Sequence, residues 1–318
     1  MKNMFKPLAF AAAILLAHTA TLAEDWTPPG PITMMIGFAA GGGADTQARL
    51  IAQGIEKKYG WKILPKQVTG NSGLSLASEL SKSPTDGTAF GMVVSESLTY
   101  SALAAGNPEL QLEQFTPLAT TASFELGLVA MSDGAFNSWE NVVAAAEAGT
   151  PIRFGVASDR QGDVAYLFGK SAGIDFNIVP VKGGAGVMNG LRGGDLDIGW
   201  VAGAQSKAVQ QGEMVNIASG IPSKLKGSPD APLIADLGSS FALDGYFMFI
   251  APGNLDPDAR AALGAAIEDV LNDPSTEANA LVTNGFGGAD VITGDELDAK
   301  MKELLENATQ LLAKANES

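Results

Sequence analysis

The sequence contains no cysteine and a single histidine, His18. Without cysteine the chain has no disulfide, no thiolate nucleophile and no attachment point for a lipid. His18 lies in a segment that we expect to be removed, so the remaining chain lacks the residues of a Ser-His-Asp triad and the usual nitrogen and sulfur ligands of zinc. Paired carboxylates or a Ser-Lys dyad would still permit catalysis. The composition therefore disfavours an enzyme and predicts no metal and no cofactor.

Long hydrophobic runs are scarce as well, and the one near the N-terminus is too short to span a membrane. It extends from Leu8 to Leu16, follows Lys2 and Lys6, and precedes small residues that end at Ala23. This is the pattern of a secretory signal peptide. We expect residues 1–23 to be the signal peptide and the mature chain to be a free periplasmic protein, since no cysteine can carry a lipid.

Basic residues are few, with 20 Lys and Arg against 35 Asp and Glu, which gives a formal net charge of −15. Loss of Lys2 and Lys6 with the signal peptide would bring this charge to −17, because no acid is lost with them. Such a charge argues against nucleic acid and anionic membrane surfaces as partners. An anionic ligand would have to be held by local donors, such as the backbone amides at helix starts.

What the sequence does contain is a run of three glycines, Gly41–Gly43, at the end of the apolar segment that begins at Ile32. A helical pattern follows over residues 46–59, and Asp45 stands at the expected N-cap. The amides at such a helix start, with about half a positive charge, can hold a carboxylate or phosphate that glycines allow to approach closely. Alternatively, the glycines only let the helix pack closely on a sheet. The spacing matches neither nucleotide-binding glycine motif, so a nucleotide is not indicated.

Beyond this loop, strand and helix patterns alternate in the α/β manner along the chain. Two sets of such units predict two lobes: residues 24–130 form lobe 1, residues 131–243 form lobe 2, and residues 244–318 return to lobe 1. Glycine-rich or polar turns end strands in both sets, at residues 38–45, 70–73, 95–97, 158–163, 182–186 and 201–205. Ligands of open α/β sheets bind beyond the carboxyl ends of the strands. We therefore expect these turns to line one ligand cleft that closes by lobe movement.

Several short motifs, spread in order over nearly the whole mature chain, resemble those of a known family. Phe38–Asp45 is similar to its Pro-Gly-Gly-x-x-Asp loop, Pro84–Thr88 to its Pro-x-Asp-Gly-Tyr-Thr segment, and Lys182–Gly183 to its Tyr-Lys-Gly. Ser228–Pro232 resembles its Leu-Pro-Asp-Val-Pro, and Ala251–Gly253 resembles its Ala-Pro-x-Gly. The family is that of the solute-binding receptors of tripartite tricarboxylate transporters, the Bug family of periplasmic proteins.

This resemblance implies a type II periplasmic-binding-protein fold, with two α/β lobes and a ligand cleft between them. It also implies capture of a small organic anion, a mono-, di- or tricarboxylate, and its delivery to a permease with a large and a small membrane subunit. We expect a monomer. A receptor that presents its ligand to a sensor kinase cannot be distinguished from a transport receptor by sequence.

The resemblance further implies which residues contact the ligand. In the family, backbone amides of the first loop hold one carboxylate, and the corresponding residues here are Phe38, Ala39, Ala40, Gly41 and Gly42. Asp45 is expected to cap its helix, since a carboxylate should not face the ligand's own, and Asp163 is likewise expected to be a cap. The other expected contacts are Asn71, Ser72 and Ser95 in lobe 1, Arg160, Gln161, Gly162, Lys182, Gly184 and Trp200 in lobe 2, and Tyr246.

Two basic residues among these allow two interpretations each. Arg160 would bind a distal carboxylate of the ligand as a bidentate pair, or it would pair with Asp159 or Asp163 on the surface. Lys182 would contact the ligand or remain a solvated, structural lysine.

The aromatic and acidic candidates are equally open. Trp200 and Tyr246 would stack on a flat ligand or belong to the core. Glu96, if it faces the cleft, would repel a second carboxylate and favour an amine or hydroxyl on the ligand. A rival interpretation from another class is a periplasmic hydrolase or lyase that uses Asp159, Asp163 and Glu96.

Overall fold

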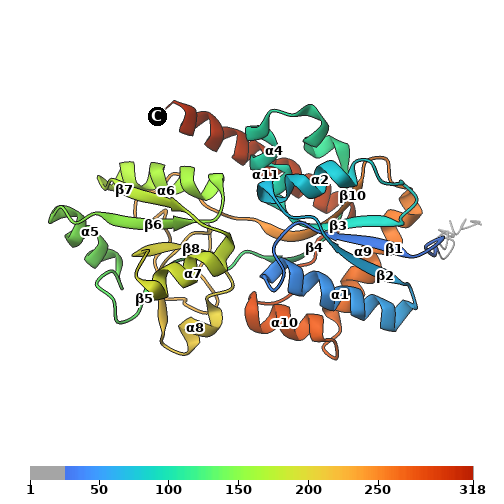
Figure 1. Cartoon of the computed structure of the whole chain (residues 1–318), viewed down its shortest axis with the longest axis horizontal. Helices are drawn as coiled ribbons and strands as arrows, with labels where there is room; N and C mark the ends of the chain where they lie inside the picture. Colours follow the sequence, from blue (N-terminus) through green and yellow to red (C-terminus); the bar gives the residue numbers. More distant parts are fainter. Residues whose placement is uncertain (1–25, 318) are drawn as a thin grey trace, which may run out of the picture.

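The computed structural model describes residues 26–317, so the expected signal peptide lies outside the described residues. The chain folds into two five-stranded sheets, each covered by helices on both faces (Figure 1). In order across the sheet, lobe 1 contains β2 (Ile63–Gln67), β1 (Ile32–Ile36), β3 (Ala89–Val94), β10 (Tyr246–Pro252) and β4 (Phe115–Ser123). Lobe 2 contains β7 (Phe176–Pro180), β6 (Ile152–Val156), β8 (Ile198–Ala202), β5 (Leu126–Met131) and β9 (Met214–Ser219). The predicted two-lobed α/β architecture is confirmed.

Each sheet contains one antiparallel strand, and this strand is the first that the chain forms after it crosses from the other lobe. In lobe 1, β1 runs parallel to β2 and β3, whereas β10 is antiparallel to both β3 and β4. In lobe 2, β6 runs parallel to β7 and β8, whereas β5 is antiparallel to both β8 and β9. The chain passes from lobe 1 to lobe 2 between β4 and β5, and it returns through residues 220–245 before β10.

The sequence-based boundary after residue 130 needs correction, because β5 lies in the sheet of lobe 2. The apolar runs of β4 and β5 are separated by only two residues, Phe124 and Glu125. A separation this short is typical of two neighbouring strands in one sheet, so the sequence places both in lobe 1. Here the chain instead remains extended and enters the other sheet, so the crossing precedes Leu126.

Helices cover both faces of each sheet, and alternate strand residues point to each face. In lobe 1, α1 (Gly43–Tyr59), α9 (Pro257–Asn272) and α10 (Glu277–Gly285) pack on one face, and α2 (Leu74–Leu80), α3 (Ser95–Leu98), α4 (Tyr100–Ala105) and α11 (Gly294–Asn316) on the other. In lobe 2, α5 (Trp139–Glu147) and α6 (Asp159–Ala172) cover one face, and α7 (Gly183–Gly193) and α8 (Ser206–Gln210) the other. Three short 3₁₀ turns occupy Asn71–Gly73, Pro108–Leu110 and Leu112–Gln114.

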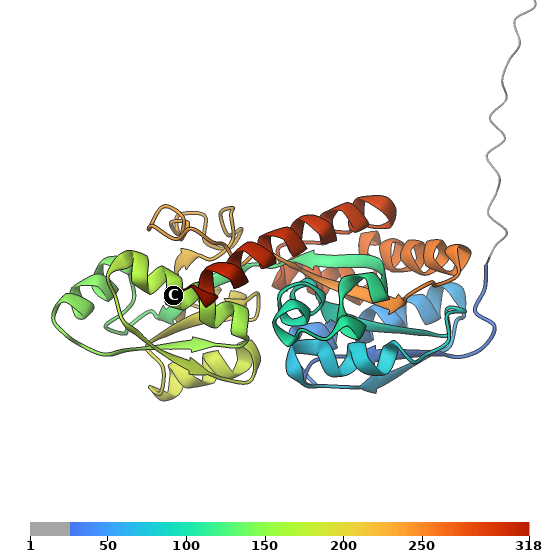
Figure 2. The same ribbon diagram turned by 90° about the horizontal axis from the view of Figure 1, so that it is seen from above.

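The last helix joins the two lobes. Figure 2 shows α11 running from lobe 1 across the junction, with its C-terminal end above lobe 2. It contacts β4, α3 and α4 in lobe 1 and α6 in lobe 2. Within residues 26–317 no helix is both long enough and apolar enough to cross a membrane.

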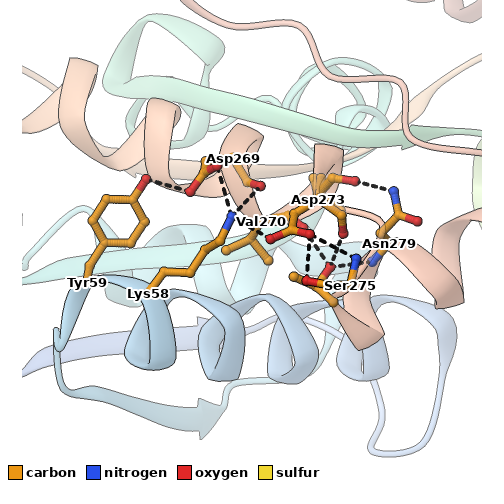
Figure 3. A network of polar contacts seen from close by, with 9 residues as sticks. Lys58, Tyr59, Asp269, Val270, Asp273, Ser275 and Asn279 are labelled. Atoms are coloured by element: carbon orange, nitrogen blue, oxygen red, sulfur yellow. Dashed lines mark hydrogen bonds and ion pairs between the residues drawn. The ribbon is translucent and has the colours of Figure 1, made fainter.

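The helix that follows the first glycine-rich loop is fixed at its C-terminal end (Figure 3). Lys58 Nζ lies 2.9 Å from carboxylate oxygens of both Asp269 and Asp273, and the Tyr59 hydroxyl donates to Asp269 at 2.9 Å. Ser275 donates to Asp273 through its amide and its hydroxyl. These contacts tie the C-terminal end of α1 to α9.

This network predicts an acid-dependent loss of stability. Hydrogen bonds from Ser275 and Lys58 hold the pKa of Asp273 well below its usual range, and Lys58 and Tyr59 do the same for Asp269. A carboxyl group whose pKa is lowered on folding stabilises the fold above its unfolded pKa, about 4, and this contribution is lost as the pH falls toward the folded pKa. Asp273→Asn should therefore lower the thermal midpoint at pH 7, by a difference that shrinks progressively below about pH 4.

Thermal unfolding followed by circular dichroism at pH 7, 5, 4 and 3 measures this difference. Asp230→Asn is the matched control, because Asp230 is exposed and forms no ion pair with any residue in the described range. A difference between wild type and Asp273→Asn that stays constant from pH 7 to pH 3 would contradict the prediction.

Candidate functional site

The first loop, residues 38–42, connects β1 to α1 at the edge where lobe 1 meets lobe 2. Its helix begins at Gly43 with Gly42 as N-cap, three residues earlier than predicted, so Asp45 is not the N-cap. Asp45 instead lies inside the first turn of the helix. Its Oδ2 accepts a hydrogen bond from the Gly41 amide at 2.9 Å, and its Oδ1 accepts one from Arg49 Nε at 2.9 Å. The local sequence misplaces the cap because an extended Gly42 can serve as N-cap without a side chain.

The first loop therefore uses some of its amides internally. The Gly41 amide is bound to Asp45, and the Gly42 amide donates to the carbonyl of Ala39 at 3.2 Å. The amides of Gly43 and Ala44, in the first turn of α1, have no backbone acceptor among residues 26–317. These amides, together with the exposed backbone of Ala39 and Ala40, are the donors available to an anion.

Phe286, which the sequence did not indicate, closes one side of this helix start. A Cβ added at Gly43 would lie 2.8 Å from the Phe286 ring, and one added at Gly203 in lobe 2 would lie 2.7 Å from it. The ring also packs edge-on against Phe247, with centroids 5.2 Å apart. Phe286 thus stands between the lobes beside the α1 N-terminus. Its isolated place in the sequence Asn-Gly-Phe-Gly-Gly is the only local signal for this role.

A turn with left-handed backbone lies next to the first loop. Four consecutive residues have positive φ: Gly70 at 128°, Asn71 at 48°, Ser72 at 54° and Gly73 at 94°. Non-glycine residues held in this region cost of order 1 kcal/mol or more each, and they persist where the surroundings impose the conformation. We call residues 70–73 the left-handed turn.

Two contacts hold the left-handed turn in place. The Ser97 hydroxyl donates to the Ser72 carbonyl at 2.6 Å, and a Cβ on Gly73 would lie 2.4 Å from Ser97 Oγ and 3.7 Å from the Phe38 ring. The first loop, the left-handed turn and α3 therefore pack together as one part of lobe 1, in which the residues of α3 are buried. Ser95 belongs to it, since its Oγ accepts from the Tyr246 amide at 3.1 Å.

Glu96, in α3, extends from this part of lobe 1 to lobe 2. Its side chain is buried, with 6% of the residue exposed, and it forms a hydrogen bond with Ser158, the N-cap of α6. Burial raises the pKa of the Glu96 carboxyl group, and the nearby Arg160 charge and the Ser158 hydrogen bond oppose this rise. The position confirms that Glu96 faces the other lobe.

Ser158, and not Asp163, caps α6. The Ser158 Oγ accepts from the Gln161 amide at 3.3 Å, and Gln161 Oε1 accepts from the Ala157 amide at 2.8 Å. Asp163 lies one turn further along α6 and accepts a hydrogen bond from the Tyr100 hydroxyl of lobe 1. The prediction of Asp163 as a cap is therefore wrong, because Ser158, five residues earlier, already provides the cap together with Gln161.

Arg160 has its partners within the chain. Its guanidinium group donates to the Asp244 carbonyl at 2.6 Å, to Asp244 Oδ1 at 3.1 Å and to the Ala242 carbonyl at 3.2 Å, and 6% of the residue is exposed. Neither of the aspartates predicted as alternative partners binds it. Both terminal nitrogens are thus engaged within the chain, whereas the buried Nε has no hydrogen-bond partner among residues 26–317. Bidentate binding of a distal carboxylate stays a prediction, and it would have to replace some of these internal bonds.

Of the two aromatic candidates, Trp200 is corrected, and the ligand contact of Tyr246 stays a prediction. Trp200 is fully buried in lobe 2, its ring 5.2 Å from that of Phe154, so it belongs to the core and does not stack on a ligand. Tyr246 is half-buried and packs with the residues on the α11 face of lobe 1. Burial raises the pKa of its hydroxyl, and the charge of nearby Lys300 opposes the rise.

The remaining lobe 2 candidates lie at the starts of α6 and α7, the helices that follow β6 and β7. Gly162 is half-buried in the first turn of α6, and Lys182 is the exposed N-cap of α7. No residue in the described range forms an ion pair with Lys182. A Cβ on Gly184 would lie 3.2 Å from Val201 Cγ1, so this helix start rests against the end of β8.

A separate cavity of about 110 Å³ lies on the α10 side of the junction. Its lining includes Glu125, Gln205, Asn216, Lys226 and Thr283. Glu125 accepts from the Lys226 amide at 2.9 Å, and burial raises its pKa. The volume is well below the roughly 300–1,000 Å³ of typical ligand pockets, so the cavity does not replace the loop surface as the candidate site. Among residues 26–317 no group of three or more acidic side chains could hold a metal ion.

Comparison with known proteins identifies relatives over most of the chain. The model of the tripartite tricarboxylate transporter family receptor matches residues 47–308. A protein of the TAR-I ttuE-ttuC′ intergenic region of Agrobacterium vitis is 27% identical over 95% of this chain and 90% of its own length. Protein BugT of Bordetella pertussis is 26% identical over 85% of each chain.

Solved structures share the fold. MatC from Rhodopseudomonas palustris with bound malate is 20% identical, with a TM-score of 0.75 over 90% of this chain and 99% of that one. Rpa4515 from the same organism with adipate is 20% identical, with a TM-score of 0.76 over 91% and 98%. The periplasmic binding protein BugD is 19% identical, with a TM-score of 0.77 over 91% and 99%.

The left-handed turn gives a prediction for stability. Ser72→Gly should raise the free energy of unfolding by about 1 kcal/mol, because glycine adopts positive φ without steric cost. Ser78→Gly is the matched control: Ser78 lies inside α2, where glycine should lower the free energy of unfolding by about 0.5 kcal/mol. Urea unfolding of both variants measures the two signs, and equal destabilisation by both substitutions would show that the turn stores no strain.

Proposed function

The chain belongs to the tripartite tricarboxylate transporter receptor family, and we propose that it captures a small organic carboxylate in the periplasm and delivers it to the permease subunits of such a transporter. Members of this family are solute-binding receptors and not enzymes. Two of the acids named by the rival hydrolase interpretation also have structural roles, since Glu96 binds Ser158 and Asp163 binds Tyr100.

The observation that carries the proposal is the start of α1. Its first turn presents the unpaired amides of Gly43 and Ala44 beside an exposed loop backbone, and no cationic side chain is needed to neutralise a bound carboxylate. In a protein of net charge −15, fixed backbone dipoles supply a local positive potential without altering that charge. The malate and adipate bound to the two Rhodopseudomonas structures support a carboxylate as the ligand class.

We assign the ligand site to loops from both lobes. In lobe 1 these are Phe38 to Gly42, Asn71 and Ser72 of the left-handed turn, and Ser95. In lobe 2 they are the helix starts at Gln161, Gly162, Lys182 and Gly184. Movement of the lobes about the two crossings would bring the second group onto a ligand held by the first.

The cellular setting follows from the same proposal. Residues 1–23 have the pattern of a signal peptide, which would export the mature chain as a monomeric periplasmic receptor. Adjacent genes for a large and a small membrane subunit would support transport. A neighbouring sensor kinase gene would support the alternative, a receptor that reports its ligand to a kinase.

Thermal-shift screening of the mature chain against mono-, di- and tricarboxylates tests the proposal. A ligand present at about a hundred times its dissociation constant adds roughly 2.7 kcal/mol to the free energy of unfolding, and so produces a clear rise in thermal midpoint. We expect at least one organic acid to give such a rise, with no turnover of the acid. Clear shifts with sugars or cations, and none with any organic acid, would refute the proposal.

The role of the first loop is tested by Gly42→Val. A Cβ at Gly42 would already lie 3.1 Å from the Ala39 carbonyl, so the valine side chain must displace the loop and obstruct approach to the α1 amides. We expect affinity to fall at least tenfold while the circular dichroism spectrum is unchanged. Gly30→Val is the matched control, because a Cβ there meets no atom within 4 Å and the residue lies before β1. Unchanged affinity of Gly42→Val would remove the first loop from the site.

A further inference from the structure

The N-terminus of α6 already holds a carboxylate, and it comes from the other lobe. α6 is a 14-residue helix whose N-cap, Ser158, is bonded to Glu96 of lobe 1. The Ser158 oxygen accepts from the Gln161 amide, so its hydroxyl proton is free to point at Glu96. A buried carboxylate at a helix start is the arrangement that an anionic ligand would adopt there.

The other groups near this helix start are also occupied by the chain itself. Both terminal nitrogens of Arg160 bind Asp244 and Ala242 in the returning crossing, and Asp163 binds Tyr100 of lobe 1. The Nε of Arg160 is buried without a hydrogen-bond partner among residues 26–317, and pairing of the terminal nitrogens with a second ligand carboxylate would displace these internal bonds.

Glu96 is buried in α3, next to residues that we propose for the ligand. The residues on each side of it are bonded within lobe 1: Ser97 donates to the left-handed turn at Ser72, and Ser95 accepts from the Tyr246 amide. The left-handed turn in turn lies against Phe38 of the first loop. The left-handed turn and Ser97 thus connect the first loop to Glu96, which makes the Glu96 carboxyl group a neighbour of the loop proposed to anchor the ligand.

We infer that Glu96 is a specificity-determining residue that takes the place of a ligand's distal carboxylate at α6. The site then accepts compounds with one carboxylate and an uncharged or positively charged far end, such as an amide, hydroxyl or ammonium group, and it rejects α,ω-dicarboxylates. This inference rests on the proposed function and narrows its ligand class. The negative groups at the α6 start, Glu96 together with Asp159, Asp163 and Asp244, outnumber the one cation, Arg160, so a further carboxylate adds like-charge repulsion.

The test uses pairs of probes that differ only at the far end: succinate and its half-amide, glutarate and its half-amide, and adipate and its half-amide. Isothermal titration calorimetry at pH 7.5 on the mature chain gives the ratio of affinities within each pair. For wild type we expect at least one half-amide to bind at least tenfold more tightly than its diacid. For Glu96→Gln, which keeps the shape and removes the charge, we expect that ratio to fall at least tenfold.

Asp159→Asn is the matched control, because it removes one negative charge from the same helix start at an exposed residue. The ratio of half-amide to diacid affinity should change by less than twofold in Asp159→Asn. A change as large as that of Glu96→Gln would show that any negative charge near the α6 start has this effect, and would overturn the inference. A wild-type chain that binds a diacid as tightly as its half-amide also overturns the inference, whether or not Glu96→Gln folds, and leaves the proposed function standing. Binding of no organic acid at all by wild type would overturn the proposed function itself.

Discussion

The architecture depends on the two crossings that exchange one antiparallel strand between the sheets. Because β10 enters beside β3 and β5 enters beside β8, each sheet is completed by a strand from the far side of a crossing. The parallel strands β1 and β3 of lobe 1 and β6 and β8 of lobe 2 consequently end at the junction between the lobes, where the ligand loops of open α/β sheets are found. The first loop, the left-handed turn, α3 and the start of α6 are neighbours for this reason, although up to 120 residues separate them along the chain.

Local patterns in the sequence were sufficient for the two-lobed α/β architecture and for the position of the first loop, but they did not predict the helices α4, α8 and α10. Apolar periodicity and glycine-rich turns predicted the two α/β sets, because these signals depend on neighbours a few residues away. Helix caps were less certain for the same reason: Asp45 and Asp163 have suitable side chains, but Gly42 and Ser158 are the N-caps. The cap is decided by where the chain leaves the strand, which the side chains alone do not determine.

Long-range partners could not be predicted in this way. Arg160 binds Asp244, which is 84 residues distant, and the nearer aspartates are not its partners. The place of Phe286 between Gly43 and Gly203 likewise depends on how α10 returns to the junction. The sequence alone allows Trp200 to contact a ligand or, more often for such a residue, to belong to the core, and its pairing with Leu128 on β5 places it inside lobe 2. In each case the decisive neighbour comes from across a chain crossing.

The helix α11 has a mechanical consequence for this arrangement. Its 23 residues form a rod about 34 Å long that is seated on β4 and α4 and overhangs α6 of the opposite lobe. If the lobes rotate about the crossing strands, points near the strands hardly move, whereas the far end of the rod sweeps across α6 as the tip of a lever does. The contact of α11 with α6 thus adds resistance to such a rotation on an element that carries none of the ligand loops, so substitution on α11 can change the stiffness of the hinge while the loop chemistry stays the same.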